Sequence, residues 1–123
     1  MRRLRKLDKP RVRVGSFRLF DWLSRRLADD DATLSVIAID RLVLFGVPCD
    51  LAASLGGRLK AAARQADLDP LIAGFADDYI GYCLPAETYN SGSYEASKAF
   101  NGPDTGEQIT DELVGMLDEM GLR

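Results

Sequence analysis

The sequence contains no histidine and only two cysteines, and both shortages limit the chemistry open to one copy of the chain. Protein zinc sites draw most of their ligands from cysteine and histidine. Cys49 and Cys83 are too few for a site of four thiolates, and no mixed cysteine/histidine site can be assembled from this chain alone. The two cysteines allow one disulfide, but in a cytoplasmic protein we expect two free thiols.

Long apolar runs are also missing. A membrane-spanning helix needs about 20 consecutive apolar residues, and the best candidate, residues 34–47, is interrupted by Asp40 and Arg41. We therefore predict no transmembrane segment. The N-terminus is basic, but no apolar segment follows it as in a secretory signal. The sequence as given therefore predicts a cytoplasmic protein.

Acidic residues are scarce in the first part of the chain, and basic residues are scarce in the rest. Residues 1–26 contain ten Lys/Arg and two Asp, whereas residues 27–123 contain six Lys/Arg and seventeen Asp/Glu. A basic arm of this kind can bind the phosphates of nucleic acid or lipid. It can equally pack on the acidic remainder or remain solvated. We favour this second interpretation, and we expect no nucleic acid partner.

With 123 residues, 46% of them hydrophobic, the chain is long enough for one globular unit with a modest core. We divide it into a basic N-terminal segment, residues 1–33, and an α/β portion, residues 34–123. Residues 1–15 are expected to be loosely structured. Apolar residues at near-helical spacing predict a short helix over 17–27.

Three aliphatic runs predict strands. Residues 34–39 and 42–47 are separated by Asp40-Arg41, which predicts a β-hairpin with a two-residue turn. Residues 71–76 predict a third, buried strand. Residues 77–101 show neither helical nor strand periodicity for long and predict a long functional loop.

Two segments predict the main helices. Leucine or alanine recurs every fourth residue from Leu51 to Ala63, which predicts a helix that Asp50 caps and in which Gly56 and Gly57 allow close approach of another backbone. Asp104 and Glu107 have capping-box spacing before an apolar stripe that ends near Gly121. The fold class is therefore α/β: a small mixed sheet with a β-hairpin and two main helices.

Oxygen-bearing side chains follow two of the expected strands. Asp50 comes after one strand, and Asp77 and Tyr82 belong to the segment after the next. Ligands of α/β proteins commonly bind at such strand ends, so these side chains suit a hard cation or a shared zinc ion. Other roles are open: Asp50 as a helix cap, Asp77 as a turn residue and Tyr82 as a packing residue.

Five motifs occur in a characteristic order: PCDLAASLGGRL at 48–59, DDYIGY at 77–82, AETY at 86–89, YEAS at 94–97 and GPDT at 102–105. In residue type, order and spacing they resemble the C-terminal part of the catalytic domain of the neutral/alkaline ceramidase family. This resemblance implies a fragment of a larger α/β hydrolase domain. The implied activity is zinc-dependent hydrolysis of the amide bond of N-acyl sphingoid lipids.

The resemblance also implies roles for particular residues. Asp50 falls on a glutamate, and Tyr82 on a tyrosine, that bind zinc in the family. The implied candidates for the substrate pocket are Asp77, Tyr79, Tyr89, Tyr94 and Glu95.

The sequence departs from the family pattern at several positions. Asp50 replaces glutamate and is shorter by one C–C bond, about 1.5 Å, while Asp77 replaces asparagine and Asp104 replaces histidine. The zinc-binding histidines and the segment with the nucleophilic serine have no counterpart. The resemblance thus implies a truncated or split amidohydrolase portion, inactive alone and without a catalytic residue of its own.

The partners expected for such a portion are an upstream-encoded hydrolase chain or further copies of this chain. Zinc is expected only if another chain completes the site. The alternative is a non-enzymatic module that forms oligomers or binds an anionic partner through its basic arm. Members of the family are often secreted, which contrasts with the cytoplasmic location expected from this sequence.

Overall fold

The computed structural model describes residues 1–8, 28 and 30–123. These residues form a four-stranded sheet in the order β1-β2-β3-β5 and a separate two-stranded sheet of β4 and β6. The strands are β1 (Arg2–Arg5), β2 (Asp31–Ile39), β3 (Leu42–Gly46), β4 (Asp50–Leu51), β5 (Asp69–Ala73) and β6 (Tyr82–Cys83). The helices are α2 (Ala53–Gln65), α3 (Ala86–Tyr89), α4 (Tyr94–Ser97) and α5 (Thr105–Glu119). The predicted mixed α/β fold with two main helices is confirmed. The expected helix over 17–27 lies outside the described residues.

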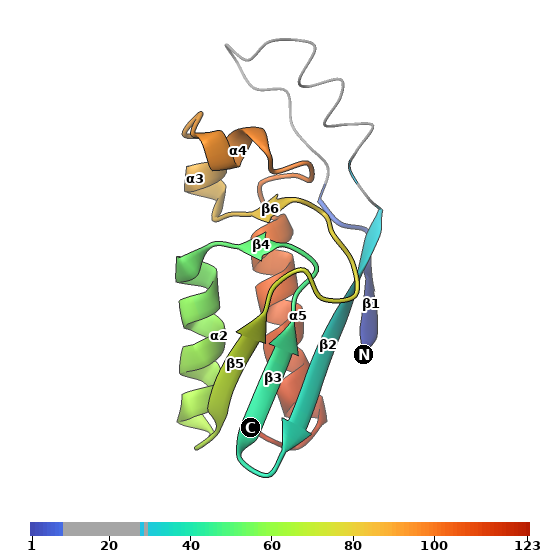
Figure 1. Ribbon diagram of the computed structural model, residues 1–123, viewed down its shortest axis with the longest axis vertical. Coiled ribbons are helices and arrows are strands. Elements are labelled where there is room, and N and C mark those ends of the chain that lie inside the picture. The colour runs from blue at the N-terminus through green and yellow to red at the C-terminus, as the bar shows by residue number, and fades with distance from the viewer. Residues whose placement is uncertain (9–27, 29) are drawn as a thin grey trace.

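The larger sheet contains both strand orientations. β2 and β3 form the predicted antiparallel hairpin, with Ile39 opposite Leu42 across the turn, and β5 joins β3 in parallel. Asp40 at the turn has a positive φ of 53°, which aspartate tolerates better than most residues. Because β3 and β5 run in parallel, they end at the same edge of the sheet. From there the chain continues into β4 and β6 (Figure 1).

Both long helices pack against this sheet and each other: α2 lies beside β5, and α5 lies behind β2 and β3 (Figure 1). Alternation along the strands turns Leu34, Val43 and Phe45 into this layer, where they are fully buried. Leu59 of α2 and Leu113 of α5 complete the core from the helix side. The opposite face of the sheet remains exposed. The expectation that β5 is a buried strand was wrong, because Leu71 of this strand is 53% exposed.

Residues 1–15 were expected to be loosely structured. This expectation was wrong for Arg2–Arg5, which form the edge strand β1, antiparallel to β2. Arg2 forms ion pairs with Glu112 and Glu119 of α5. Arg3 binds Asp31 at 2.7 Å, and this hydrogen bond lowers the pKa of Asp31. Arg2 and Arg3 thus pair with acidic residues of the same chain, while most of the basic arm, residues 9–27, lies outside the described residues.

Some element boundaries and contacts differ from those that the sequence predicted. The long loop expected over 77–101 contains β6, α3 and α4. Helix α5 begins where expected, but the Asp104 side chain forms no capping hydrogen bond, and Glu107 pairs with Arg58 of α2 instead. Ile72 approaches Gly56, whereas Gly57 faces open space, so close packing holds for one glycine only and involves a side chain.

None of the helices in the described part of the chain has the length and apolar composition of a membrane span.

Candidate functional site

Two short parallel strands bring the candidate metal ligands together. Asp50 of β4 lies opposite Tyr82 of β6. The Asp50 N–H donates to the Gly81 carbonyl at 3.0 Å, and the Ala52 N–H donates to the Cys83 carbonyl at 2.9 Å. Helix α2 starts only at Ala53, with Ala52 in the capping position. The interpretation of Asp50 as the helix cap was therefore wrong.

Asp50 and Tyr82 are both half-buried. Partial removal of Tyr82 from water raises the pKa of its phenol, and the negative charge of the neighbouring Asp50 raises this pKa further. The phenol therefore keeps its proton near neutral pH. A cation at this position would reverse the preference, because positive charge favours the phenolate.

Helix α4 adds two of the predicted pocket residues to this neighbourhood. The helix consists of Tyr94–Ser97, and the negative charge of its Glu95 also raises the pKa of Tyr82. Ser93 caps this short helix by accepting a hydrogen bond from the Ala96 N–H at 3.2 Å. Tyr94 is 67% exposed, and the Lys98 ammonium lies 5.8 Å from the centre of its ring.

The structure places the other predicted pocket residues in two regions. Asp77 accepts a hydrogen bond from the Ser35 hydroxyl of β2, and Tyr79 lies against Phe75, with ring centres 5.5 Å apart. Tyr89 is 2% exposed and belongs to a small apolar cluster against which Tyr82 packs. A pocket role for these three residues stays a prediction, while the pairing of Asp50 with Tyr82 is a geometric fact.

Gly81 is a positioning residue that sequence reasoning did not single out. Its φ is +84°, and a Cβ built there would lie 2.5 Å from the Lys98 carbonyl oxygen. Gly81 forms an antiparallel bridge with Ala99, and the Tyr82 N–H donates to the Lys98 carbonyl at 3.1 Å. The available signal was a glycine directly before the candidate ligand, a position where close backbone approach is common.

The two cysteines lie behind the Asp50–Tyr82 pair. Both are free thiols and both are buried, as predicted for free cysteines. A hydrogen bond with the Cys49 thiol, together with burial, raises the pKa of Cys83. Reactive cysteines need an accessible thiolate, and this arrangement opposes both requirements.

Thiol reactivity tests this arrangement. We expect the native chain to react slowly with 5,5′-dithiobis(2-nitrobenzoate) at pH 8, because Cys49 and Cys83 are 0% and 2% exposed. Two thiols per chain should react at once after denaturation in guanidinium chloride. Rapid reaction of either cysteine in the native protein, measured by absorbance at 412 nm, would contradict this packing.

Asp50 and Tyr82 together offer two oxygen donors to a metal ion. A carboxylate and a phenol are suitable oxygen ligands for zinc, but zinc takes about four ligands. Among the described residues, no group of three or more His, Cys, Asp and Glu side chains could hold a metal ion. The pair thus fits zinc only if other ligands are added to it.

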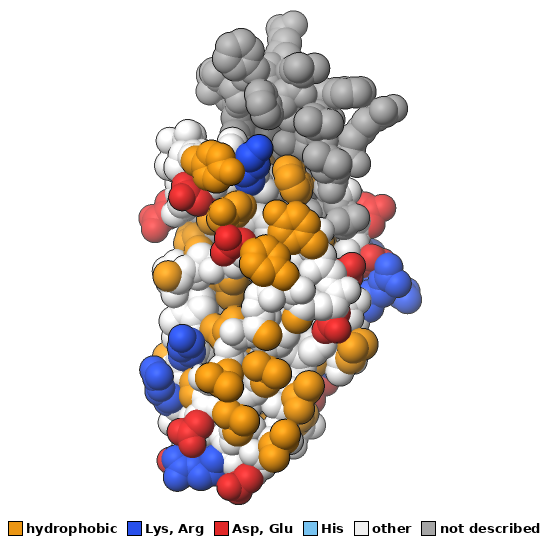
Figure 2. All heavy atoms as spheres, in the orientation of Figure 1, with side chains coloured by type: hydrophobic (Ala, Val, Ile, Leu, Met, Phe, Trp, Pro, Cys, Tyr) orange, Lys and Arg blue, Asp and Glu red, His pale blue; other side chains and the backbone are white. Residues whose placement is uncertain are grey.

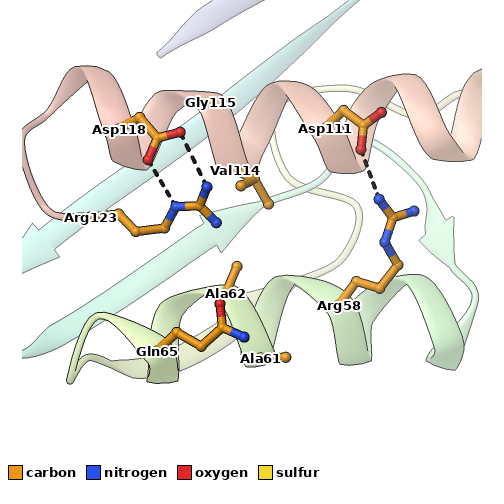
Figure 3. Close-up of a pocket in the computed structure, with 9 residues that line it drawn as sticks. All are labelled: Arg58, Ala61, Ala62, Gln65, Asp111, Val114, Gly115, Asp118 and Arg123. Carbon is orange, nitrogen blue, oxygen red and sulfur yellow. Dashed lines mark hydrogen bonds and ion pairs between the residues drawn. The ribbon is translucent and has the colours of Figure 1, made fainter.

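A groove of about 390 Å³ lies between α2 and α5, away from this pair (Figure 3). Its charged side chains are paired with one another: Arg58 with Asp111 at 2.8 Å, and Arg123 with Asp118 at 2.8 Å. Figure 3 shows these pairs along the two helices. The groove therefore presents neutralised charge and does not contribute to the Asp50–Tyr82 site.

The fold is that of one segment of a ceramidase. The crystal structure of neutral ceramidase from Pseudomonas aeruginosa matches with a TM-score of 0.65 and 22% identity, over 76% of this chain and 16% of that chain. A ceramidase complexed with C2 matches with a TM-score of 0.66 and 22% identity, over 76% of this chain and 15% of that chain.

The sequence is similar to curated neutral ceramidases. It is 27% identical to neutral ceramidase of Drosophila pseudoobscura pseudoobscura over an alignment of 93 residues, with 70% of this chain and 12% of the relative covered. It is 30% identical to neutral ceramidase A of Dictyostelium discoideum over an alignment of 100 residues, with 76% of this chain and 13% of the relative covered. No family model matches the chain. The resemblance to neutral ceramidases is confirmed: this is a ceramidase-like segment, and it spans about an eighth of the length of these relatives.

Proposed function

We propose that this chain supplies one part of the zinc site of a ceramidase-like amidohydrolase, and that other polypeptide sequence supplies the rest. The observation that carries the proposal is the side-by-side position of Asp50 and Tyr82, which lie opposite each other on neighbouring parallel strands. The substrate class is an N-acyl sphingoid lipid, by the names of the similar proteins and the motifs shared with their family.

The roles of the residues follow from their chemistry. Asp50 and Tyr82 would hold the metal together with ligands from outside the chain. Zinc, when bound, supplies Lewis-acid polarisation of the amide carbonyl and activation of the nucleophile. Tyr94 and Glu95, on helix α4 beyond β6, would border the substrate. With no histidine in the sequence, we expect the chain alone to be inactive as an amidase.

A chimera tests the proposal without requiring two chains to associate. In it, this chain replaces the matching 100-residue region of the D. discoideum neutral ceramidase A. We expect the folded chimera to bind zinc in calorimetry and to hydrolyse a ceramide. Asp50→Asn and Tyr82→Phe should each weaken zinc binding by about tenfold or more, because each removes or weakens an oxygen ligand.

Asp67→Asn serves as the matched control, since the Asp67 side chain is 87% exposed at the far end of α2. It should leave zinc affinity unchanged. A folded chimera that binds no zinc, or one in which Asp50→Asn and Tyr82→Phe bind zinc as tightly as the parent, would show that the two residues are not metal ligands.

A further inference from the structure

Apolar side chains gather on the face of the larger sheet that α2 and α5 leave uncovered. We define the open-face patch by six residues that are each between 40% and 66% exposed: Ile37, Ile39, Leu42, Leu71, Phe75 and Tyr79. Isolated exposed apolar residues are ordinary, whereas contiguous apolar patches mark interaction sites. The question is therefore whether the six are contiguous.

Strand register places the four strand residues of the patch side by side. Ile39 of β2 lies opposite Leu42 of β3, and Ile37 lies opposite Leu44, whose other neighbour is Leu71 of β5. The aromatic pair of Phe75 and Tyr79 follows β5 directly. Figure 2 shows these apolar side chains along the front of the molecule, over β2, β3 and β5 and the segment after β5.

The segment after β5 is held in a conformation that keeps Phe75 outward. Phe75 and Asp77 have positive φ values of 57° and 66°, an uncommon state that costs a bulky residue about 1–2 kcal/mol. Two hydrogen bonds to β2 hold the turn: the Ser35 hydroxyl donates to Asp77, and the Thr33 N–H donates to Asp78 at 3.0 Å. Strained backbone of this kind often occurs where a protein holds a partner or ligand.

Charged residues lie at the rim of the open-face patch. Beside the hairpin, Arg41 is paired with Asp67 at 3.2 Å and with Asp69 at 3.7 Å. An apolar, aromatic centre depleted in charge, with polar residues around it, is the usual composition of a protein–protein interface.

We propose that the open-face patch is the docking surface for the remaining part of a ceramidase-like polypeptide. Two observations select this occupant. The chain corresponds to at most 16% of its structural and sequence relatives, so most of such a polypeptide lies elsewhere. The patch also leads through residues 74–81 to Tyr82, so a body bound here lies next to the incomplete metal site. A second copy of this chain has no histidine to bring to that site. The inference rests on the proposed function.

Capture of the full chain in trans tests the proposal. The probe is D. discoideum neutral ceramidase A with its matching 100 residues deleted, tagged and co-expressed with this chain. We expect a one-to-one complex on size-exclusion chromatography. The double variant Ile39→Lys/Leu71→Lys should bind at least about tenfold more weakly, since it places charges in an apolar interface. The control Ala61→Lys/Met120→Lys adds the same charge at exposed helix positions and should bind as the parent does.

Thermal unfolding in cis gives a second, independent measurement. In the isolated chain the Ile39→Lys/Leu71→Lys variant should melt within a few degrees of the parent, because both side chains are exposed. In the chimera the attached remainder covers them, so the same variant should lower the melting temperature by about 5 °C or more.

The proposal is overturned by no capture of the parent chain, by equal capture of parent and patch variant, or by equal melting of the two chimeras. A dimer of the chain alone in sedimentation velocity that the patch variant makes monomeric assigns the patch to a second copy and also overturns it. Asp50→Asn should be captured normally. Normal capture of a chain whose chimera binds no zinc would therefore refute the proposed function and leave the docking surface intact.

Discussion

Replacing Gly81 with alanine is expected to destabilise the protein by about 3–5 kcal/mol, through backbone strain and a steric clash combined. Alanine would have to adopt the positive φ of 84° and place its Cβ 2.5 Å from the Lys98 carbonyl oxygen and 2.8 Å from the Phe100 ring. The oxygen belongs to the backbone, so relief requires residues 80–83 to separate from residues 98–100. That movement displaces Tyr82, whose own N–H donates to the same Lys98 carbonyl.

Gly92→Ala is the matched control for this substitution. Gly92 also has a positive φ, 73°, but a Cβ there meets nothing within 4 Å. It should therefore show the backbone cost alone, about 1–2 kcal/mol. The free energies of unfolding of both variants can be measured by urea denaturation followed by circular dichroism. Equal losses would mean that the contact between Gly81 and Lys98 is looser than the structure describes.

Replacing Phe45 with alanine is the second substitution with a large expected effect. It should lower the free energy of unfolding by about 3–5 kcal/mol. Phe45 is fully buried at the centre of the sheet, on the face that α2 and α5 cover. Removal of the ring loses apolar burial and leaves a cavity that the surrounding strand and helix side chains fill only in part. We expect the urea midpoint to fall accordingly.

Phe75→Ala is the control, because it makes the same chemical change at a side chain that is 60% exposed and contacts Tyr79. The Phe75→Ala substitution should lower the free energy of unfolding by about 1 kcal/mol or less. A large loss at Phe75 in the isolated chain would indicate that the open-face patch already packs against something within this chain. Similar small losses at both positions would contradict a single core between the sheet and the helices.

Elements with strong local signals were predictable from the sequence. The hairpin of β2 and β3 has two β-branched runs and a short polar turn, and α5 has a long apolar stripe, so short-range preferences suffice for both. Boundaries were less secure: β2 starts at Asp31 and α2 at Ala53. Edge strand β1 was missed because Arg2–Arg5 is mostly charged, and its pairing depends on β2 and on carboxylates of α5 about 110 residues away.

The candidate site was predictable in part. The motif order placed Asp50 and Tyr82 as joint ligands, and their strands do pair. Spacing alone favoured Asp50 as a helix cap, since a carboxylate just before a helix commonly has that role. The strand pairing that moves the helix start to Ala53 joins segments about 30 residues apart, so it lies outside any local window. Asp77 was expected beside Asp50, but its hydrogen bond to Ser35 is another long-range contact.

By itself, the sequence determined that this chain cannot assemble a histidine-based metal site, that it forms a small α/β unit, and that its motifs are those of a ceramidase segment. Composition, periodicity and motif order carry this information because they depend on residue type and local spacing. Only the tertiary structure decided that Asp50 lies opposite Tyr82 on paired strands, that Gly81 must approach Lys98, and that one face of the sheet stays apolar and open. These features depend on which distant segments pack together, and packing is set by the whole fold.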